Sequence, residues 1–487
     1  MATEKKSKAE LLKEELILSP KSTGHRMSDA EIKKAFDFCN GYKNFLDAAK
    51  TEREAVVVTE SMLQKNGFLP FDANVKYNPG DKVYLSNRGR AMLFATIGKR
   101  PLREGVRIVA SHIDSPRIDL KPRPLYEESQ LALLKTHYYG GIRKYQWVAI
   151  PLALHGVISK KDGTALEVSI GEAPGDPVFV INDLLPHLAQ EQGQRKLHDG
   201  IRGEELNILV GSLPFKDDKA SELVKLNIMR ILNEKYGIVE ADFLSADLYA
   251  VPAGKARDVG FDFSMIGAYG HDDRVCAYTS IMASLGISKP DYTWINILAD
   301  REEVGSDGPT GLQSRFLEYF VADLAKPHGL EGREVLSQSQ CLSADVNAAH
   351  DPTFADVTEK RNTAYLGYGV CITKYTGSRG KSSTNEATAE FTGKVRRLLD
   401  ANGVVWQTGE LGRVDLGGGG TVAKYVSKLG VDTIDIGVPV LSMHAPFETV
   451  SKTDTYQAYL AFTAFLSEKA PVPKAAPKPA PKARAGK

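Results

Sequence analysis

Apolar residues recur at three- and four-residue steps along roughly the first 70 positions of the chain, which is the spacing of amphipathic helices. Two of these segments begin with a capping pattern, in which a hydroxyl residue is followed three positions later by glutamate. Ser28 with Glu31 and Thr51 with Glu54 have this spacing. The N-terminal region is therefore expected to be helical, with helices that start near these two pairs.

A different pattern begins after Gly105. Residues 106–116 are a β-branched apolar run that ends in polar residues and a proline, so we expect a buried strand that leads into a loop. Residues 118–256 then alternate between short apolar strands and turn residues, with one helix near 221–236. This stretch is expected to form a separate β-rich domain.

Helical and strand patterns alternate again beyond residue 257. Alternation of this kind is typical of a doubly wound α/β sheet that is covered by helices on both faces. We therefore predict a mixed-sheet α/β domain formed by residues 1–117 and 257–469, with the β-rich domain 118–256 inserted between its two parts. The supporting patterns are helices at 271–286, 311–325 and 385–403 and strands at 292–300 and 431–440.

Composition and charge narrow the classes of function. The chain has 487 residues, of which 42% are hydrophobic and 25% are charged, so it can bury a sizeable core in two or three domains. Lys and Arg total 62 against 61 Asp and Glu, and this balance predicts no nucleic-acid binding. No apolar run reaches the ~18 residues of a membrane span, so no membrane association is expected.

The terminal segments and the cysteines favour a cytoplasmic location. The N-terminal residues are charged throughout and lack the apolar region of a signal peptide. Cys39, Cys276, Cys341 and Cys371 are far apart and form no CxxC pair, as expected in a reducing compartment. Residues 470–487 are rich in Pro, Ala and Lys, and we predict that they form a disordered tail.

Polar residues suited to catalysis lie at the ends of several predicted strands or at the start of a helix. In open α/β sheets, ligands bind in the crevice at the carboxyl ends of the strands. We therefore expect these side chains to lie together. They are His112 and Asp114, Asp272 and Asp273, Glu302 and Glu303, Asp345, and His444.

This set of residue types indicates a metal centre. Two imidazoles and at least three carboxylates supply the nitrogen and oxygen ligands of two zinc-like divalent ions, and no cysteine is needed. Two ions about 3.5–4 Å apart form a common hydrolytic centre. One further carboxylate should stay free as a general base, and the adjacent Glu302 and Glu303 are suited to divide these tasks.

The order and context of these segments resemble the aspartyl aminopeptidase/aminopeptidase I family of dinuclear zinc metallopeptidases. The resemblance extends from about Ser28 to Lys469 and leaves out the tail. It implies that the two α/β parts form a proteolytic domain and that the β-rich insert is a dimerisation domain. It also implies peptide substrates and self-association to dimers and then to a tetrahedral dodecamer.

The resemblance implies a ligand role for five residues. His112 and Asp345 would bind the first metal, Glu303 and His444 would bind the second, and Asp272 would bridge both. Zinc is the expected metal, with cobalt and manganese as alternatives in an oxygen-rich pair of sites.

The resemblance also implies the parts of the catalytic machinery that are not ligands. Asp114 would lie behind the first imidazole and modulate its basicity, and Glu302 would be the general base. Family members often have an Asp-Asn pair where this chain has Asp272-Asp273, so the choice of Asp272 as the bridge rests on its position.

Two further matches concern the substrate. His187 lies in a segment that looks like the family's inserted-domain motif, whose histidine reaches a neighbouring subunit's active site and stabilises the tetrahedral intermediate. Lys374 matches a region that lines the substrate pocket, where it would pair with an acidic side chain or an oxyanion. The implied reaction removes acidic or neutral N-terminal residues from peptides. It would proceed by attack of a metal-bridging water on the first peptide carbonyl, with Glu302 taking the proton of that water.

Two other interpretations remain open at this point. A two-metal hydrolase of another amide or of an ester would use the same ligands, and dependence on a free α-amine would separate it from an aminopeptidase. A non-catalytic scaffold with the same fold would be favoured by the loss of a ligand or of the base. All six expected positions are filled, which favours an enzyme.

Overall fold

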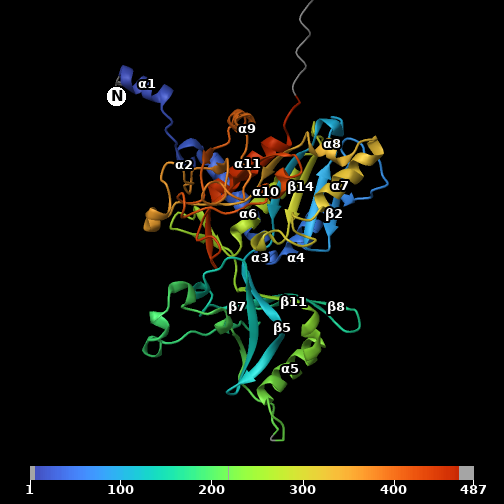
Figure 1. The fold of residues 1–487 in the computed structure, drawn as a ribbon, viewed down its shortest axis with the longest axis vertical. Coiled ribbons are helices and arrows are strands. Elements are labelled where there is room, and N and C mark those ends of the chain that lie inside the picture. The colour runs from blue at the N-terminus through green and yellow to red at the C-terminus, as the bar shows by residue number, and fades with distance from the viewer. Residues whose placement is uncertain (1–5, 218, 471–487) are drawn as a thin grey trace, which may run out of the picture.

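The structure is a computed structural model that describes residues 6–217 and 219–470. It has an α/β lobe that carries most of the helices and a smaller β-rich lobe (Figure 1). The α/β fold class expected from the sequence, with its mixed sheet, is confirmed. The predicted tail lies outside the described residues from residue 471 onward.

A nine-stranded mixed sheet forms the centre of the α/β lobe. In spatial order its strands are β1 (Leu69–Pro70), β2 (Lys82–Asn87), β3 (Ala91–Thr96), β14 (Trp294–Ala299), β4 (Arg107–His112), β15 (Gln340–Ser343), β19 (Asp432–Gly437), β17 (Val370–Thr373) and β18 (Trp406–Thr408). The four strands from β14 to β19 pair in parallel. Every residue of β3, β4 and β14 is buried, because helices cover both faces of the sheet.

Two hydrophobic cores lie on opposite faces of this sheet. Met92 and Phe94 of β3 belong to one core, whereas the alternate residues Leu93 and Ala95 belong to the other. The first core is closed by α3 (Asp29–Ala48), α4 (Glu52–Lys65), α6 (His271–Leu285), α9 (Ala389–Ala401) and α11 (Lys452–Leu466). The second is closed by α7 (Phe316–Ala325), α8 (Gly332–Leu336) and α10 (Ala423–Ser427).

The N-terminal region is helical, as predicted. Ser28 and Thr51 are the N-caps of α3 and α4, and each forms a capping box with the glutamate three residues later. Two shorter helices, α1 (Lys8–Leu16) and α2 (Thr23–Arg26), precede them. No residue of α1 is buried, and it lies away from the lobe (Figure 1). Within the described part of the chain, no helix has the length and apolar character that a membrane span requires.

The β-rich lobe is a seven-stranded antiparallel sheet with α5 (Leu223–Tyr236) beside it. Its spatial order is β8 (Ala165–Ile170), β7 (Leu152–Ser159), β11 (Ala246–Pro252), β5 (Arg117–Glu128), β6 (Leu131–Tyr139), β10 (Ile208–Gly211) and β9 (Val180–Ile181). The chain leaves the α/β lobe after β4 and returns after β11, so the sheet is an insertion. The expected boundaries at residues 118 and 256 stay a prediction.

A third, five-stranded sheet was not expected from the sequence. It contains β12 (Arg257–Val259), β13 (Met265–Ala268), β21 (Glu448–Ser451), β20 (Pro439–Leu441) and β16 (Asn347–Ala348). The apolar run 431–440, predicted as one strand, is split at Val438 between β19 of the central sheet and β20 of this one. In this sheet the end of β13, which leads into α6, pairs with the start of β21.

Candidate metal centre

The predicted polar segments converge at the carboxyl ends of the central strands. His112 ends β4, and a short 3-10 turn at Glu302–Val304 follows β14. Asp345 comes two residues after β15, Asp272 lies in the first turn of α6, and His444 lies between β20 and β21. Parallel strands end at the same edge of a sheet, so residues far apart in the sequence meet there.

Asp272 lies between the two imidazoles of this cluster. Its Oδ1 is 3.1 Å from His112 Nε2, and its Oδ2 is 3.1 Å from His444 Nε2. Glu303 Oε2 is 3.4 Å from His444 Nε2, and Asp345 Oδ1 is 3.9 Å from His112 Nε2. One carboxylate therefore spans the centre, with a histidine and a second carboxylate on each side of it.

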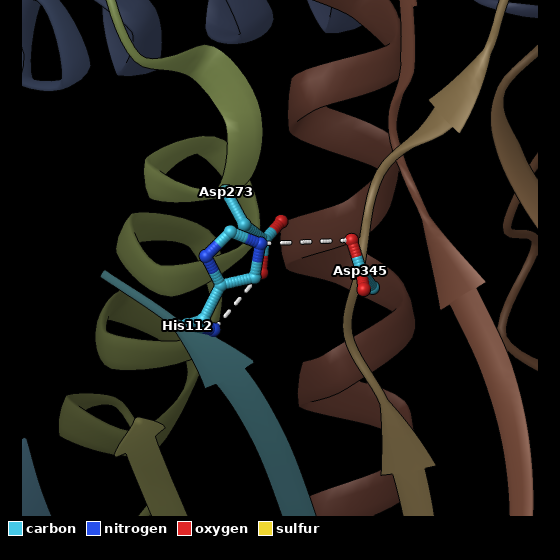
Figure 2. A group of neighbouring side chains, drawn as sticks. All are labelled: His112, Asp273 and Asp345. Atoms are coloured by element: carbon cyan, nitrogen blue, oxygen red, sulfur yellow. Dashed lines mark hydrogen bonds and ion pairs between the residues drawn. The ribbon is translucent and has the colours of Figure 1, made fainter. Parts of the chain in front are cut away.

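The adjacent Asp273 faces the first half of the centre. Figure 2 shows it beside His112 and opposite Asp345. Asp273 Oδ2 accepts a hydrogen bond from the backbone N–H of His112 at 3.2 Å. Ligand atoms of these three residues all lie within 4.8 Å of one another, so Asp273 is a second candidate ligand there. Of the two aspartates, Asp272 is the one that contacts both imidazoles.

Asp114 holds the turn that carries the two glutamates. Its Oδ1 accepts from the backbone N–H of Glu302 at 3.1 Å, and its Oδ2 accepts from that of Glu303 at 3.2 Å. The hydroxyl of Tyr139 donates to Oδ2 at 2.8 Å. His112 Nδ1 lies 3.0 Å from the carbonyl oxygen of Asp114 and 3.4 Å from Oδ1. Asp114 thus contacts the first imidazole and also orients both glutamates.

The electrostatics of the cluster favour bound cations. Burial raises the pKa of Glu302 to about 7 and that of Glu303 and Asp345 well above their usual range, and neighbouring carboxylates act in the same direction. Burial lowers the pKa of His444, but its contacts with Asp272 and Glu303 outweigh this and raise it to about 10. Divalent ions would replace these protons, since metal binding displaces them.

The donor set fits zinc. Imidazole nitrogens and carboxylate oxygens are common zinc ligands. Among the described residues, the buried Oε1 of Glu303 has no hydrogen-bond donor, which leaves an acceptor free for an ion. The residues present therefore suit a pair of divalent ions.

A cleft of about 540 Å³ opens against the cluster. Asp272, Glu302, Glu303 and Asp345 line it. The glycine run at 418–420 also lines it, and a Cβ at Gly418 would overlap the backbone of a facing loop. Other lining residues are Asn347, Thr373 and Thr376, together with Lys424 and Tyr425, which the sequence did not single out.

Two of the predicted site residues lie apart from the cluster within one chain. His187 is in the exposed 3-10 turn Pro186–Leu188 of the β-rich lobe. Lys374 follows β17, and its Nζ is 3.4 Å from Glu386 Oε1. Lys374 is outside the described cleft lining, although the preceding residue, Thr373, belongs to it.

Comparison with known proteins gives a consistent result. Residues 45–466 match the family model described as aminopeptidase I zinc metalloprotease (M18). A probable M18 family aminopeptidase 1 from Clostridium acetobutylicum is 50% identical over 93% of this chain and 99% of its own. The crystal structure of an M18 aminopeptidase from Thermotoga maritima has a TM-score of 0.89 and 44% identity, and the match covers 93% of this chain and all of that one.

A more distant solved structure shares the fold. The mApe1 dodecamer of S. cerevisiae is 21% identical, with a TM-score of 0.71, over 90% of this chain and 97% of that chain. The family model matches most of the chain, and the 50% identity to the Clostridium protein is far higher than chance would give over that length. The chain therefore belongs to the M18 family of zinc metalloproteases and is an aminopeptidase.

Proposed function

We propose that this aminopeptidase uses two metal ions bridged by Asp272, with Glu302 as its general base. The position of Asp272, with one oxygen 3.1 Å from each imidazole, is the observation that carries the proposal. His112 and Asp345 would hold the first ion, and Glu303 and His444 the second. Zinc is the metal that the family match favours.

The two adjacent glutamates differ in their surroundings, which supports separate roles. Glu303 lies 3.4 Å from His444 Nε2, as a ligand of the same ion would. Glu302 lines the cleft, as Glu303 does, and Asp114 holds both backbones, so the contact with His444 is what distinguishes the two. A carboxylate at the cleft wall is within reach of a water and of a leaving group, which is the position that a general base needs.

Bound zinc would supply Lewis acidity, which polarises the scissile carbonyl and makes water more acidic. Glu302 accepts the proton of the attacking water and then returns it to the leaving amine. The carboxylates of the cluster hold the free α-amine of the peptide by charge attraction. Hydrolysis is thereby limited to the first peptide bond, and the product is a free N-terminal amino acid.

A second copy of the chain completes the site in this proposal. His187 is exposed in the β-rich lobe, and its neighbours Leu184, Leu185 and Leu188 are at least half exposed. Exposed leucines that cluster in this way are typical of a surface covered by a partner. The yeast relative is a dodecamer. Self-association of this chain, first to dimers, would let His187 reach the oxyanion in the site of a neighbouring subunit.

The peptides cleaved would begin with acidic or neutral residues. Thr373, Thr376 and Asn347 give the cleft polar, uncharged groups, and Lys424 adds a positive charge. Lys374 would act on an acidic side chain from just beyond this lining.

A panel of dipeptides tests this function. Dipeptides that begin with Asp, Glu, Leu, Met or Lys would be supplied free and N-acetylated, with zinc present, and amino-acid release would be measured. Cleavage of the free-amine members alone is expected. Cleavage of acetylated members would indicate a hydrolase of another amide, and no cleavage by a zinc-loaded chain would indicate a scaffold.

The base is tested by Glu302→Gln, which keeps the shape of the side chain but removes its ability to take a proton. It should abolish turnover and leave the zinc content at the wild-type level. Glu390→Gln, the same change at an exposed position of α9, is the matched control and should keep full turnover. Substantial turnover by Glu302→Gln would refute the assignment.

A further inference from the structure

A second buried carboxylate, Glu448, lies behind the metal centre. It is the first residue of β21, and only 1% of it is exposed. Its Oε1 accepts from the backbone N–H of His444 at 2.6 Å, and its Oε2 accepts from that of Asp272 at 3.1 Å. Each oxygen of one carboxylate thus holds the backbone of a different candidate ligand.

Neither of the two backbone N–H groups that Glu448 binds is paired within a helix or a strand. The N–H of Asp272 is in the first turn of α6, where helical partners are lacking. His444 has a φ of 66°, in the left-handed region that residues other than glycine disfavour. A buried acceptor at this point therefore favours the backbone conformation that brings both side chains into the cluster.

The arrangement repeats the one at Asp114. That residue accepts from the backbone N–H groups of Glu302 and Glu303. Two buried carboxylates therefore each hold a pair of cluster residues through their main chains. Groups that orient metal ligands in this way usually affect metal affinity or activity about 10- to 100-fold.

We propose that Glu448 is a positioning residue that fixes Asp272 and His444 relative to each other and thereby sets the affinity of the ion they share. The inference rests on the ligand assignment of the proposed function. Asp272 has a further anchor, because Ser115 Oγ donates to its carbonyl oxygen at 2.5 Å. The ion bound by His444 should therefore depend on Glu448 more than the ion bound by His112.

Glu448→Gln tests the inference with almost no change in shape. One oxygen is replaced by an NH₂ group, which opposes a backbone N–H donor instead of accepting from it. The chain offers a matched control at Asp454, which is also fully buried and accepts from the N–H groups of Gly367 and Gly369 at 2.6 and 2.7 Å. Asp454→Asn makes the same change in a part of α11 outside the cleft lining.

Zinc affinity would be measured on the purified full chain by competition with a chromogenic chelator, and the visible spectrum of the cobalt-substituted protein would report ligand geometry. Glu448→Gln should weaken one of the two ions roughly 10- to 100-fold and alter the cobalt spectrum. Asp454→Asn should match the wild type in both. Wild-type affinity and spectrum in Glu448→Gln, or equal zinc loss in both variants, would overturn the inference.

Two further outcomes keep the test decisive. If Glu448→Gln does not fold, Glu448→Asp keeps the charge but withdraws it by one methylene. It should then weaken the same ion, and wild-type zinc affinity in it would overturn the inference. A wild-type chain that binds fewer than two ions would instead contradict the proposed two-metal function, and this is seen before any variant is compared.

Discussion

The substitution Asp114→Asn tests whether the cluster depends on a carboxylate that is not itself an expected ligand. Asp114 accepts three hydrogen bonds, from the backbone N–H groups of Glu302 and Glu303 and from the hydroxyl of Tyr139. Asparagine has a single carbonyl oxygen, so it can accept hydrogen bonds at only one of the two oxygen positions of Asp114. With its oxygen at the Oδ2 position, it retains two of the bonds, and its NH₂ group opposes the N–H of Glu302.

The expected magnitude follows from that one lost acceptor. A buried donor left without a partner costs about 1–3 kcal/mol. The turn can relieve this cost by moving Glu302 away from its place in the cleft. The general base would then be misplaced, so the cost should appear as weaker stabilisation of the transition state. A cost of about 1.4 kcal/mol corresponds to a tenfold change in rate, so kcat/KM should fall roughly 10- to 100-fold.

The assay compares kcat/KM on a free dipeptide with zinc content for Asp114→Asn and Tyr139→Phe. The phenylalanine variant removes one donor and keeps the carboxylate, so it should lose only about fivefold, in line with a hydrogen bond worth ~1 kcal/mol. Zinc content should stay near the wild-type level in both variants. If Asp114→Asn keeps kcat/KM within about threefold of the wild type, Asp114 does not orient the base.

Four further predictions concern other parts of the molecule. His187→Phe should lower turnover at unchanged zinc content, and unchanged turnover would remove His187 from the mechanism. Lys374→Ala should slow cleavage of dipeptides that begin with Asp or Glu more than those that begin with Leu; an equal effect on both would contradict its assigned role. Dialysis against a chelator should abolish turnover and added zinc should restore it, whereas activity in the metal-free chain would exclude a metal mechanism. At His155, burial lowers the pKa, but contacts with Glu172 and Glu54 raise it above the ordinary value. The stabilisation is therefore complete below the unfolded pKa of about 6.5 and is lost as the pH rises through the folded pKa. The Tm difference between wild type and His155→Gln should shrink above neutral pH, and a constant difference would contradict the assignment.

The sequence predicted those features that depend on local patterns. The capping boxes at Ser28 and Thr51 are confirmed because each is a contact between residues three positions apart. The buried strand that ends in His112 is confirmed because a continuous apolar run identifies it. The hairpin of β2 and β3 was not predicted from the sequence. The third sheet was not predicted either, because its strands of two to four residues are too short to show a pattern.

The candidate metal centre shows which features sequence patterns can predict and which they cannot. Strand ends identified the residues that meet, because chain topology brings them to one edge of the sheet. The groups that orient them come from distant segments: Glu448 is 176 positions from Asp272, and Tyr139 reaches Asp114 from the other lobe. A buried glutamate at the start of a short strand has no signature in the sequence, since its role depends on which N–H groups the fold places against it. Candidate ligands can therefore be found from a pattern of residue types, whereas the residues that set their geometry require the tertiary structure.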